Sequence, residues 1–249
     1  MPGAERRPRG LLFDLFGTLV FFDAGRLPRV RVAGVERPST IAAPDDLLAR
    51  LTPAPTLEAL YDALRSVSEA FARETHATYA EISSPERFRR ALCALDARGD
   101  VEGIAIELSR RHMHGLSQAV VCPEDRIALL EALRERYRVA LVSNFDHGPT
   151  AHELLGRNGL AALFGAIVVS EELGLRKPHA RLFLTACEKL GLAPEECLHI
   201  GDSHEADVCG AVQAGLAALW VDAGESEPAP ALARIADVRE LPRWLESRF

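Results

Sequence analysis

The sequence predicts an α/β protein with a Rossmann-like parallel sheet, helices on both faces of that sheet, and an inserted, mostly α-helical segment. Near both ends of the chain, short apolar runs alternate with amphipathic stretches, which is typical of parallel strands joined by helical crossovers. Between the first two apolar runs lies a long stretch of different character. We therefore expect one unit built from residues 1–23 and 123–249, and a second formed by residues 24–122.

Apolar runs mark the expected strands, because strands covered on both faces are almost continuously apolar. They lie at residues 11–15, 139–143, 166–169, 197–200 and 217–221. Helices are expected between them, at residues 124–136, 150–157, 180–190 and 205–214. Spacing supports the first helix, since Ile127, Leu130 and Leu133 fall on one face. A Pro- and Glu-rich turn at residues 224–230 is expected before a terminal helix.

The inserted segment begins with alternating residues and then becomes helical. Residues 29–37 alternate like a small hairpin with Gly34 near its turn. Leu57, Leu60, Leu64 and Val67 then form one apolar stripe at helical spacing. A further helix is expected to start at residues 84–86, a Ser-Pro-Glu sequence typical of helix N-termini.

Composition narrows the class of partner. The formal charge of −7 and the pI near 5.7 argue against nucleic acid or an anionic membrane as the main partner. Five scattered cysteines form no metal or disulfide pattern, and Asp14 interrupts the first apolar run, so it does not resemble a signal peptide. We expect a cytoplasmic protein, a monomer or homodimer, that acts on a small molecule.

Polar residues stand where several expected strands end. Asp14 lies at the end of the first strand, Ser143 closes the second, and Asp202 follows the strand at 197–200. Ligands of open parallel sheets bind outside the carboxyl ends of the strands, so these side chains are expected to converge. Crowded carboxylates repel one another unless a cation joins them, and Mg²⁺ suits oxygen ligands and a phosphate group. The sequence therefore predicts a Mg²⁺ site, with Asp207 adding to the cluster.

Four short motifs in this order resemble those of the haloacid dehalogenase superfamily, in the subfamily with a helical cap between the first two motifs. They are the run from Asp14 to Thr18, Ser143-Asn144, Lys177-Pro178, and Gly201-Asp202 with Asp207. Each motif is weak alone, and their order carries the resemblance. The residues at 1–23 and 123–249 then correspond to the catalytic core, and residues 24–122 to the cap.

The resemblance implies a mechanism in which Asp14 attacks phosphorus and forms an aspartyl-phosphate that water hydrolyses. The implied catalytic residues are Asp14, Ser143 and Lys177. The implied substrate-binding residues are Thr18, Ser143, Asn144 and Lys177. The implied Mg²⁺ ligands are Asp14, the backbone carbonyl of Phe16, Asp202, and Asp207 through water.

Phe16 departs from the family pattern, which places a second aspartate there as general acid and base. Loss of a positioned acid and base costs about 10²–10⁴-fold in rate. Three outcomes are compatible with this loss. The first is a slow phosphatase, or one for leaving groups that need little protonation, with Asp146, His147 or a cap histidine as a substitute acid. The second is a 2-haloacid dehalogenase, because halide leaves without a proton. The third is a non-catalytic binding protein.

The acidic fourth motif separates the first two outcomes. Dehalogenases of this group work without metal and usually have neutral residues there, whereas this chain keeps Asp202, Glu205 and Asp207. An uncompensated acidic cluster would repel a haloacid anion. A phosphonatase would need a cap lysine, and residues 24–122 contain none. The sequence therefore favours a Mg²⁺-dependent phosphatase of a small phosphorylated metabolite.

Overall fold

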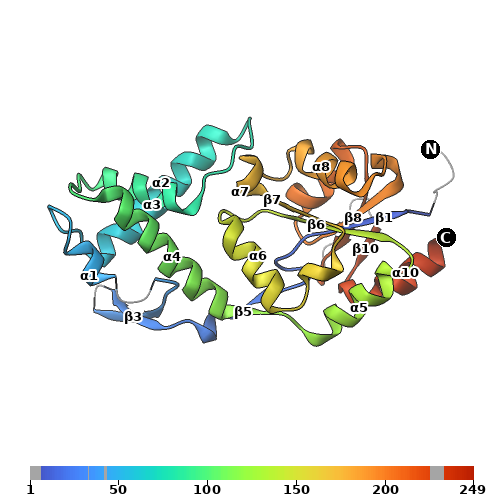
Figure 1. Ribbon diagram of the computed structural model, residues 1–249, viewed down its shortest axis with the longest axis horizontal. Coiled ribbons are helices and arrows are strands. Elements are labelled where there is room, and N and C mark those ends of the chain that lie inside the picture. Colours follow the sequence, from blue (N-terminus) through green and yellow to red (C-terminus); the bar gives the residue numbers. More distant parts are fainter. Residues whose placement is uncertain (1–6, 33, 42–43, 225–232) are drawn as a thin grey trace. The chain divides into compact units, whose positions relative to one another are not determined.

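The computed structural model describes residues 7–32, 34–41, 44–224 and 233–249. By contacts the chain divides into two compact units, one formed by Met1–Phe22 with Val121–Phe249 and the other by Asp23–Val120. Figure 1 shows the elements of both. Most of the turn expected at residues 224–230 lies outside the described residues.

The first unit is built on a six-stranded sheet. Its order is β10-β9-β8-β1-β6-β7, and each pairing for which a register is given is parallel. The strands are β1 (Gly10–Phe13), β6 (Arg138–Ser143), β7 (Ala166–Val169), β8 (Cys197–Gly201), β9 (Ala217–Val221) and β10 (Ala233–Ile235). The five expected strands are confirmed, although β1 ends two residues early because the chain turns after Phe13. The short β10 was not expected.

Helices cover both faces of this sheet, as expected. They are α5 (Glu124–Arg134), α6 (Gly148–Arg157), α7 (Ser170–Leu173), α8 (Ala180–Leu190), α9 (Gly210–Gln213) and α10 (Leu241–Arg248). In Figure 1, α8 lies on one face, and α5 and α10 lie on the other. Leu12 of β1 packs in one core with Phe183 and Ala186 of α8. Because side chains alternate along a strand, Leu11 and Phe13 point to the opposite face.

The strand order creates a topological switch point at the centre of the sheet. Along the chain, β1 is followed by β6 and β7 on one side, whereas β8, β9 and β10 lie on the other. The connections that leave β1 and β8 therefore diverge at the carboxyl ends of two neighbouring strands. This divergence opens the crevice in which such sheets bind ligands.

The helix expected at residues 205–214 has two parts of different type. A π-helix runs over His204–Cys209, and α9 follows it. In the wider turn, the amide of Val208 reaches back five residues to the Ser203 carbonyl at 3.2 Å. Such π turns are frequent at functional sites. Here the turn carries Asp207.

The second unit contains a hairpin and four α-helices among its described residues. β3 (Arg29–Val32) and β4 (Val35–Pro38) pair antiparallel, which confirms the hairpin around Gly34. The helices are α1 (Asp45–Leu48), α2 (Leu57–Thr75), α3 (Ser84–Ala94) and α4 (Val101–Ala119). Leu60 of α2, Phe88 of α3 and Leu108 of α4 are buried in one core. The unit is therefore mostly α-helical, as expected.

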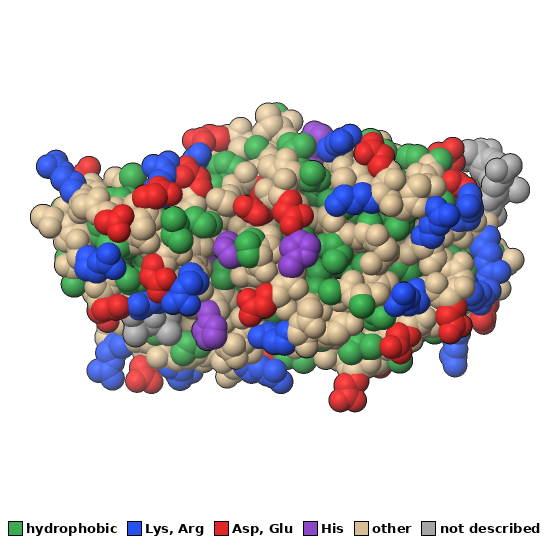
Figure 2. Space-filling view, in the orientation of Figure 1, with side chains coloured by type: hydrophobic (Ala, Val, Ile, Leu, Met, Phe, Trp, Pro, Cys, Tyr) green, Lys and Arg blue, Asp and Glu red, His purple; other side chains and the backbone are tan. Residues whose placement is uncertain are grey.

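β2 (Phe21–Phe22) and β5 (Val120–Val121) form a two-stranded sheet that is separate from the six-stranded one. Acidic and basic side chains are interspersed on the face shown in Figure 2. Within the described ranges, no helix combines the length and apolar character that a membrane crossing requires.

Candidate active site

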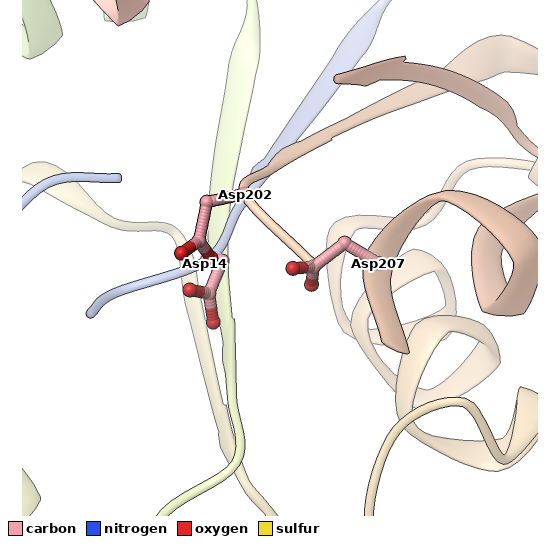
Figure 3. Close-up of side chains that lie close together, drawn as sticks. All are labelled: Asp14, Asp202 and Asp207. Atoms are coloured by element: carbon pink, nitrogen blue, oxygen red, sulfur yellow. The ribbon is translucent and has the colours of Figure 1, made fainter. Parts of the chain in front are cut away.

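Three carboxylates meet at the switch point of the sheet. Asp14 directly follows β1 and Asp202 directly follows β8, so neighbouring strands deliver both to one edge. Asp207 comes from the π-helix, and its carboxylate points toward the other two (Figure 3). One oxygen from each of the three lies within 4.8 Å of the others. The structure thus brings together the three predicted carboxylates.

Lys177 joins two of these carboxylates. Its Nζ donates to Asp14 Oδ1 and to Asp207 Oδ1, each at 2.5 Å, and the residue is only 3% exposed. Burial alone lowers the pKa of Lys177, but the charges of Asp14 and Asp207 outweigh this effect and hold it above its usual value. A fixed positive charge therefore lies beside the predicted nucleophile.

One lysine does not balance three carboxylates. Burial raises the pKa of Asp14 to about 7, against the opposing charge of Lys177 and with help from Asp207 and Asp202. Burial and the charge of Asp207 also raise the pKa of Asp202. By contrast, although burial opposes it, Lys177 and His199 hold the pKa of Asp207 well below its usual range. A further cation at this site would favour the ionised form of Asp14.

Asp207 is held by three donors. Besides Lys177, His199 Nε2 lies 2.9 Å from Asp207 Oδ1, and the Ser203 amide donates to Oδ2 at 3.0 Å. His199 is fully buried on β8, and the edge of its ring meets Phe183 at 4.9 Å between centroids. His199 was not predicted as a site residue from the sequence. A histidine inside a buried strand, eight residues before a motif aspartate, is the signal that could have indicated it.

Asn144 fixes the backbone of Lys177. Its Nδ2 donates to the Lys177 carbonyl at 3.1 Å, and the Lys177 amide donates to Asn144 Oδ1 at 2.7 Å. Both polar ends of the Asn144 side chain are thus used to hold the loop that carries the lysine. A role of Asn144 in substrate binding remains a prediction. The contact that the structure shows is with the backbone of Lys177.

Two buried hydroxyls at the site have no partner within the described part of the chain. They are Ser143 Oγ, at the end of β6, and Thr18 Oγ1, in the turn after Asp14. Each residue is 1% exposed. A buried hydroxyl without a hydrogen bond is costly, so both groups are suited to bind an oxygen-rich ligand.

Glycine at position 17 lets the first motif approach Asp202 closely. Gly17 has φ +83°, in the left-handed region, and a Cβ there would lie 2.1 Å from Asp202 Oδ2. The backbone next to Phe16 can therefore come close to the acidic cluster.

The ring of Phe16 stacks on that of Phe145, with centroids 5.3 Å apart and an interplanar angle of 28°. Of the suggested substitute acids, His147 caps α6, where its Nδ1 lies 2.9 Å from Thr150 Oγ1. The cap histidine His112 contacts Thr40 at 2.6 Å through Nδ1. The place of the usual acid is therefore aromatic, and the function of these histidines as acids stays a prediction.

The fold and site define an α/β protein with a doubly wound parallel sheet and a buried carboxylate, Asp14, at its switch point. The chain belongs to the haloacid dehalogenase-like hydrolases, since that family model matches residues 8–215. Phosphoserine phosphatase of Thermus thermophilus is 36% identical over 163 residues, which cover 64% of this chain and 65% of that protein. N-acylneuraminate-9-phosphatase of Rattus norvegicus is 34% identical over 136 residues, which cover 52% and 54%. The chain thus spans less than two thirds of these relatives.

Two solved structures share the fold. A 2-haloacid dehalogenase from Pseudomonas syringae has a TM-score of 0.71 and 25% identity, with 97% of this chain and 99% of that chain covered. The magnesium-bound hydrolase YfnB from Bacillus subtilis has a TM-score of 0.62 and 22% identity, with 97% and 100% covered. The second likeness shows the fold alone. Since the similar proteins include phosphatases and a dehalogenase, the residues of the site must separate the two reactions.

Proposed function

We propose that this protein is a Mg²⁺-dependent phosphatase of small phosphorylated metabolites that forms an aspartyl-phosphate on Asp14. The observation that carries the proposal is the acidic cluster, in which Asp202 and Asp207 approach Asp14, and a single lysine is hydrogen-bonded to Asp14 and Asp207. Residues 1–23 and 123–249 then form the catalytic core, and residues 24–122 a cap that selects the substrate.

The residues at the cluster fit Mg²⁺. Three carboxylates supply hard oxygen ligands within a small radius, and Gly17 leaves room for the backbone to approach. Asp14, Asp202 and the backbone carbonyl of Phe16 would hold the ion, with Asp207 acting directly or through water. When bound, the ion would neutralise charge on the phosphoryl group and favour the ionised nucleophile.

The chain's own residues then supply the remaining functions. A carboxylate oxygen of Asp14 attacks phosphorus, and the bond from phosphorus to the leaving oxygen breaks. Lys177 provides a fixed positive charge beside the attacking group. The unpartnered hydroxyls of Ser143 and Thr18 donate hydrogen bonds to phosphoryl oxygens. The two-step reaction uses Asp14, Lys177 and the two hydroxyls together at the carboxyl edge of the sheet.

A 2-haloacid dehalogenase is the second candidate, favoured by Phe16 and by the similarity to the Pseudomonas syringae enzyme. In that reaction Asp14 would attack carbon, and halide would leave without a proton. The acidic cluster opposes it, because a haloacid carries a negative charge of its own. Without a cation, the substrate would meet three carboxylates and one lysine.

One assay separates the candidates. A panel of phosphate esters, acyl phosphates and 2-haloacids is incubated with Mg²⁺ and, in parallel, with a chelator. We expect phosphate release only with Mg²⁺, and none from Asp14→Asn. Phosphate release that survives the chelator contradicts the proposal, and chelator-resistant halide release assigns the dehalogenase reaction. If nothing is released although Mg²⁺ binds, the protein is a binding protein of this fold.

A further inference from the structure

We infer that the stacked pair of Phe16 and Phe145 restricts this site to phosphates whose leaving group departs as a stable anion. The substrate class is therefore acyl phosphates and phosphates of acidic hydroxyls, such as phenols and enols, rather than phosphates of simple alcohols. This inference rests on the proposed phosphatase function and adds the chemical class of the substrate.

The backbone at both residues of the pair is fixed within the first unit. The Phe145 amide donates to Ser170 Oγ at 2.9 Å, and Ser170 Oγ donates to the Phe145 carbonyl at 3.2 Å. Phe16 forms a bridge with Val20, and the next amide, of Gly17, donates to the Val20 carbonyl at 2.8 Å. Phe145 is 8% exposed. Stacked pairs of this kind add about 0.5–1.5 kcal/mol beyond the area they bury, so the Phe16 ring has a defined place.

Among the described residues of the first unit, the polar groups that bond to Asp14 or to its partner Lys177 are engaged with one another. Asp207 accepts hydrogen bonds from Lys177, His199 and Ser203, which is the pattern of an ionised carboxylate. Lys177 is committed to two carboxylates. His147, just beyond Phe145, is turned toward Thr150 at the start of α6. The family pattern places the acid two residues after the nucleophile, and in this chain a hydrocarbon ring, that of Phe16, occupies this position.

The first chemical step then proceeds without protonation of the leaving group. A bond forms between an oxygen of Asp14 and phosphorus, the bond from phosphorus to the leaving oxygen breaks, and that oxygen keeps the electron pair. An alkoxide is a poor leaving group, whereas a carboxylate or phenolate accepts the charge readily. The rate of this step should therefore follow the acidity of the leaving group.

The second step lacks the base that the family's aspartate would supply, because Phe16 stands in its position. Water attacks phosphorus, the bond from phosphorus to Asp14 breaks, and the proton of the water passes to solvent or buffer. With a good leaving group this hydrolysis becomes the slower step. We expect a burst of leaving group close to one equivalent per enzyme, followed by one common turnover rate for the best substrates.

The test uses a series of aryl phosphates of graded phenol acidity, together with acetyl phosphate and phosphoserine, at saturating Mg²⁺. For the unaltered protein, kcat/KM should rise steeply with leaving-group acidity, and phosphoserine should be turned over at least about 10²-fold more slowly than acetyl phosphate. Phe16→Asp should flatten this dependence, raise phosphoserine turnover by about 10²–10⁴-fold and abolish the burst. Phe16→Asn is the matched control, because it is polar and nearly isosteric with aspartate but cannot exchange a proton.

The outcomes separate this inference from the proposed function. A flat dependence on leaving-group acidity in the unaltered protein overturns the inference and leaves the phosphatase function in place. Equal gains in Phe16→Asn and Phe16→Asp overturn it too, because polarity alone would then explain the effect. No phosphate release from any substrate defeats the proposed function itself. If Phe16→Asp does not fold, as judged by circular dichroism, the series with the unaltered protein still decides the question.

Discussion

Asp14→Asn is expected to stabilise the folded protein at pH 8 in the presence of a chelator, although it removes the nucleophile. Burial holds the pKa of Asp14 at about 7, above the value of 3.8 for an exposed aspartate. At pH 8 without a cation, the folded chain therefore carries a charge that its surroundings disfavour. Asparagine has the same shape and can still present an oxygen to Lys177, but it carries no charge.

The magnitude follows from the difference between these pKa values. Each pKa unit corresponds to about 1.36 kcal/mol, so a shift from 3.8 to about 7 sets an upper limit of roughly 4 kcal/mol. Between about pH 4 and pH 7 the folded state holds a proton that the unfolded chain has released. Its stability therefore falls as the pH rises through this window. The advantage of Asp14→Asn should be absent below pH 4, grow up to pH 7 and then stay constant.

Urea unfolding of both proteins from pH 4 to pH 9, in chelator and then in Mg²⁺, measures this effect. Asp207→Asn is the matched control with the opposite sign, because Lys177 and His199 hold the pKa of Asp207 below its usual range. It breaks a buried ion pair and should lower the free energy of unfolding by about 3 kcal/mol at pH 8. The reasoning is refuted if Asp14→Asn is the less stable protein at pH 8 in chelator, or if its advantage shrinks between pH 4 and pH 7.

Three further substitutions test individual contacts of the site. Lys177→Met should lower kcat by about 10²-fold or more, because it removes the charge beside Asp14; a smaller loss with Mg²⁺ bound would assign the lysine a structural role. Asn144→Ala leaves the Lys177 amide and carbonyl without partners, so we expect a loss of about 1–3 kcal/mol in unfolding free energy and a lower kcat. His199→Phe keeps the packing on Phe183 but removes a donor to Asp207, and should weaken Mg²⁺ binding by about 10–100-fold in calorimetry, with partial recovery in His199→Gln.

The sequence was sufficient for the fold because its signals are local and periodic. The strands at 166–169 and 217–221 and the helix at 180–190 have the expected bounds, since buried strands are apolar throughout and a glycine follows the helix. The meeting of Asp14 and Asp202 was also predictable, because both follow parallel strands. The π turn that carries Asp207 was not predictable from the sequence. An amphipathic pattern does not show whether each amide bonds to the carbonyl five residues before it or to the carbonyl four residues before it.

The contacts that organise the site join residues that no single motif contains. Asn144 meets the backbone of Lys177 across 33 positions, and His199 supports Asp207 from inside a strand. A sequence motif identifies which residue types are present, but a hydrogen bond to a backbone leaves no trace in residue type. The stacking of Phe145 on Phe16 could not be predicted either, because a phenylalanine after Ser143-Asn144 has the sequence features of any core residue.

The Phe145 contact changes how Phe16 is understood. In the sequence, Phe16 replaces an aspartate, and this loss alone is compatible with a phosphatase, a dehalogenase or a non-catalytic protein. In the structure, the ring has a stacked partner whose backbone is fixed by Ser170. At the same edge of the sheet, the three carboxylates meet where they could hold a cation. The site thus has the carboxylates, but the stacked rings of Phe16 and Phe145 stand where the family has its acid. Such a site is suited to phosphoryl transfer from substrates whose leaving group is stable as an anion.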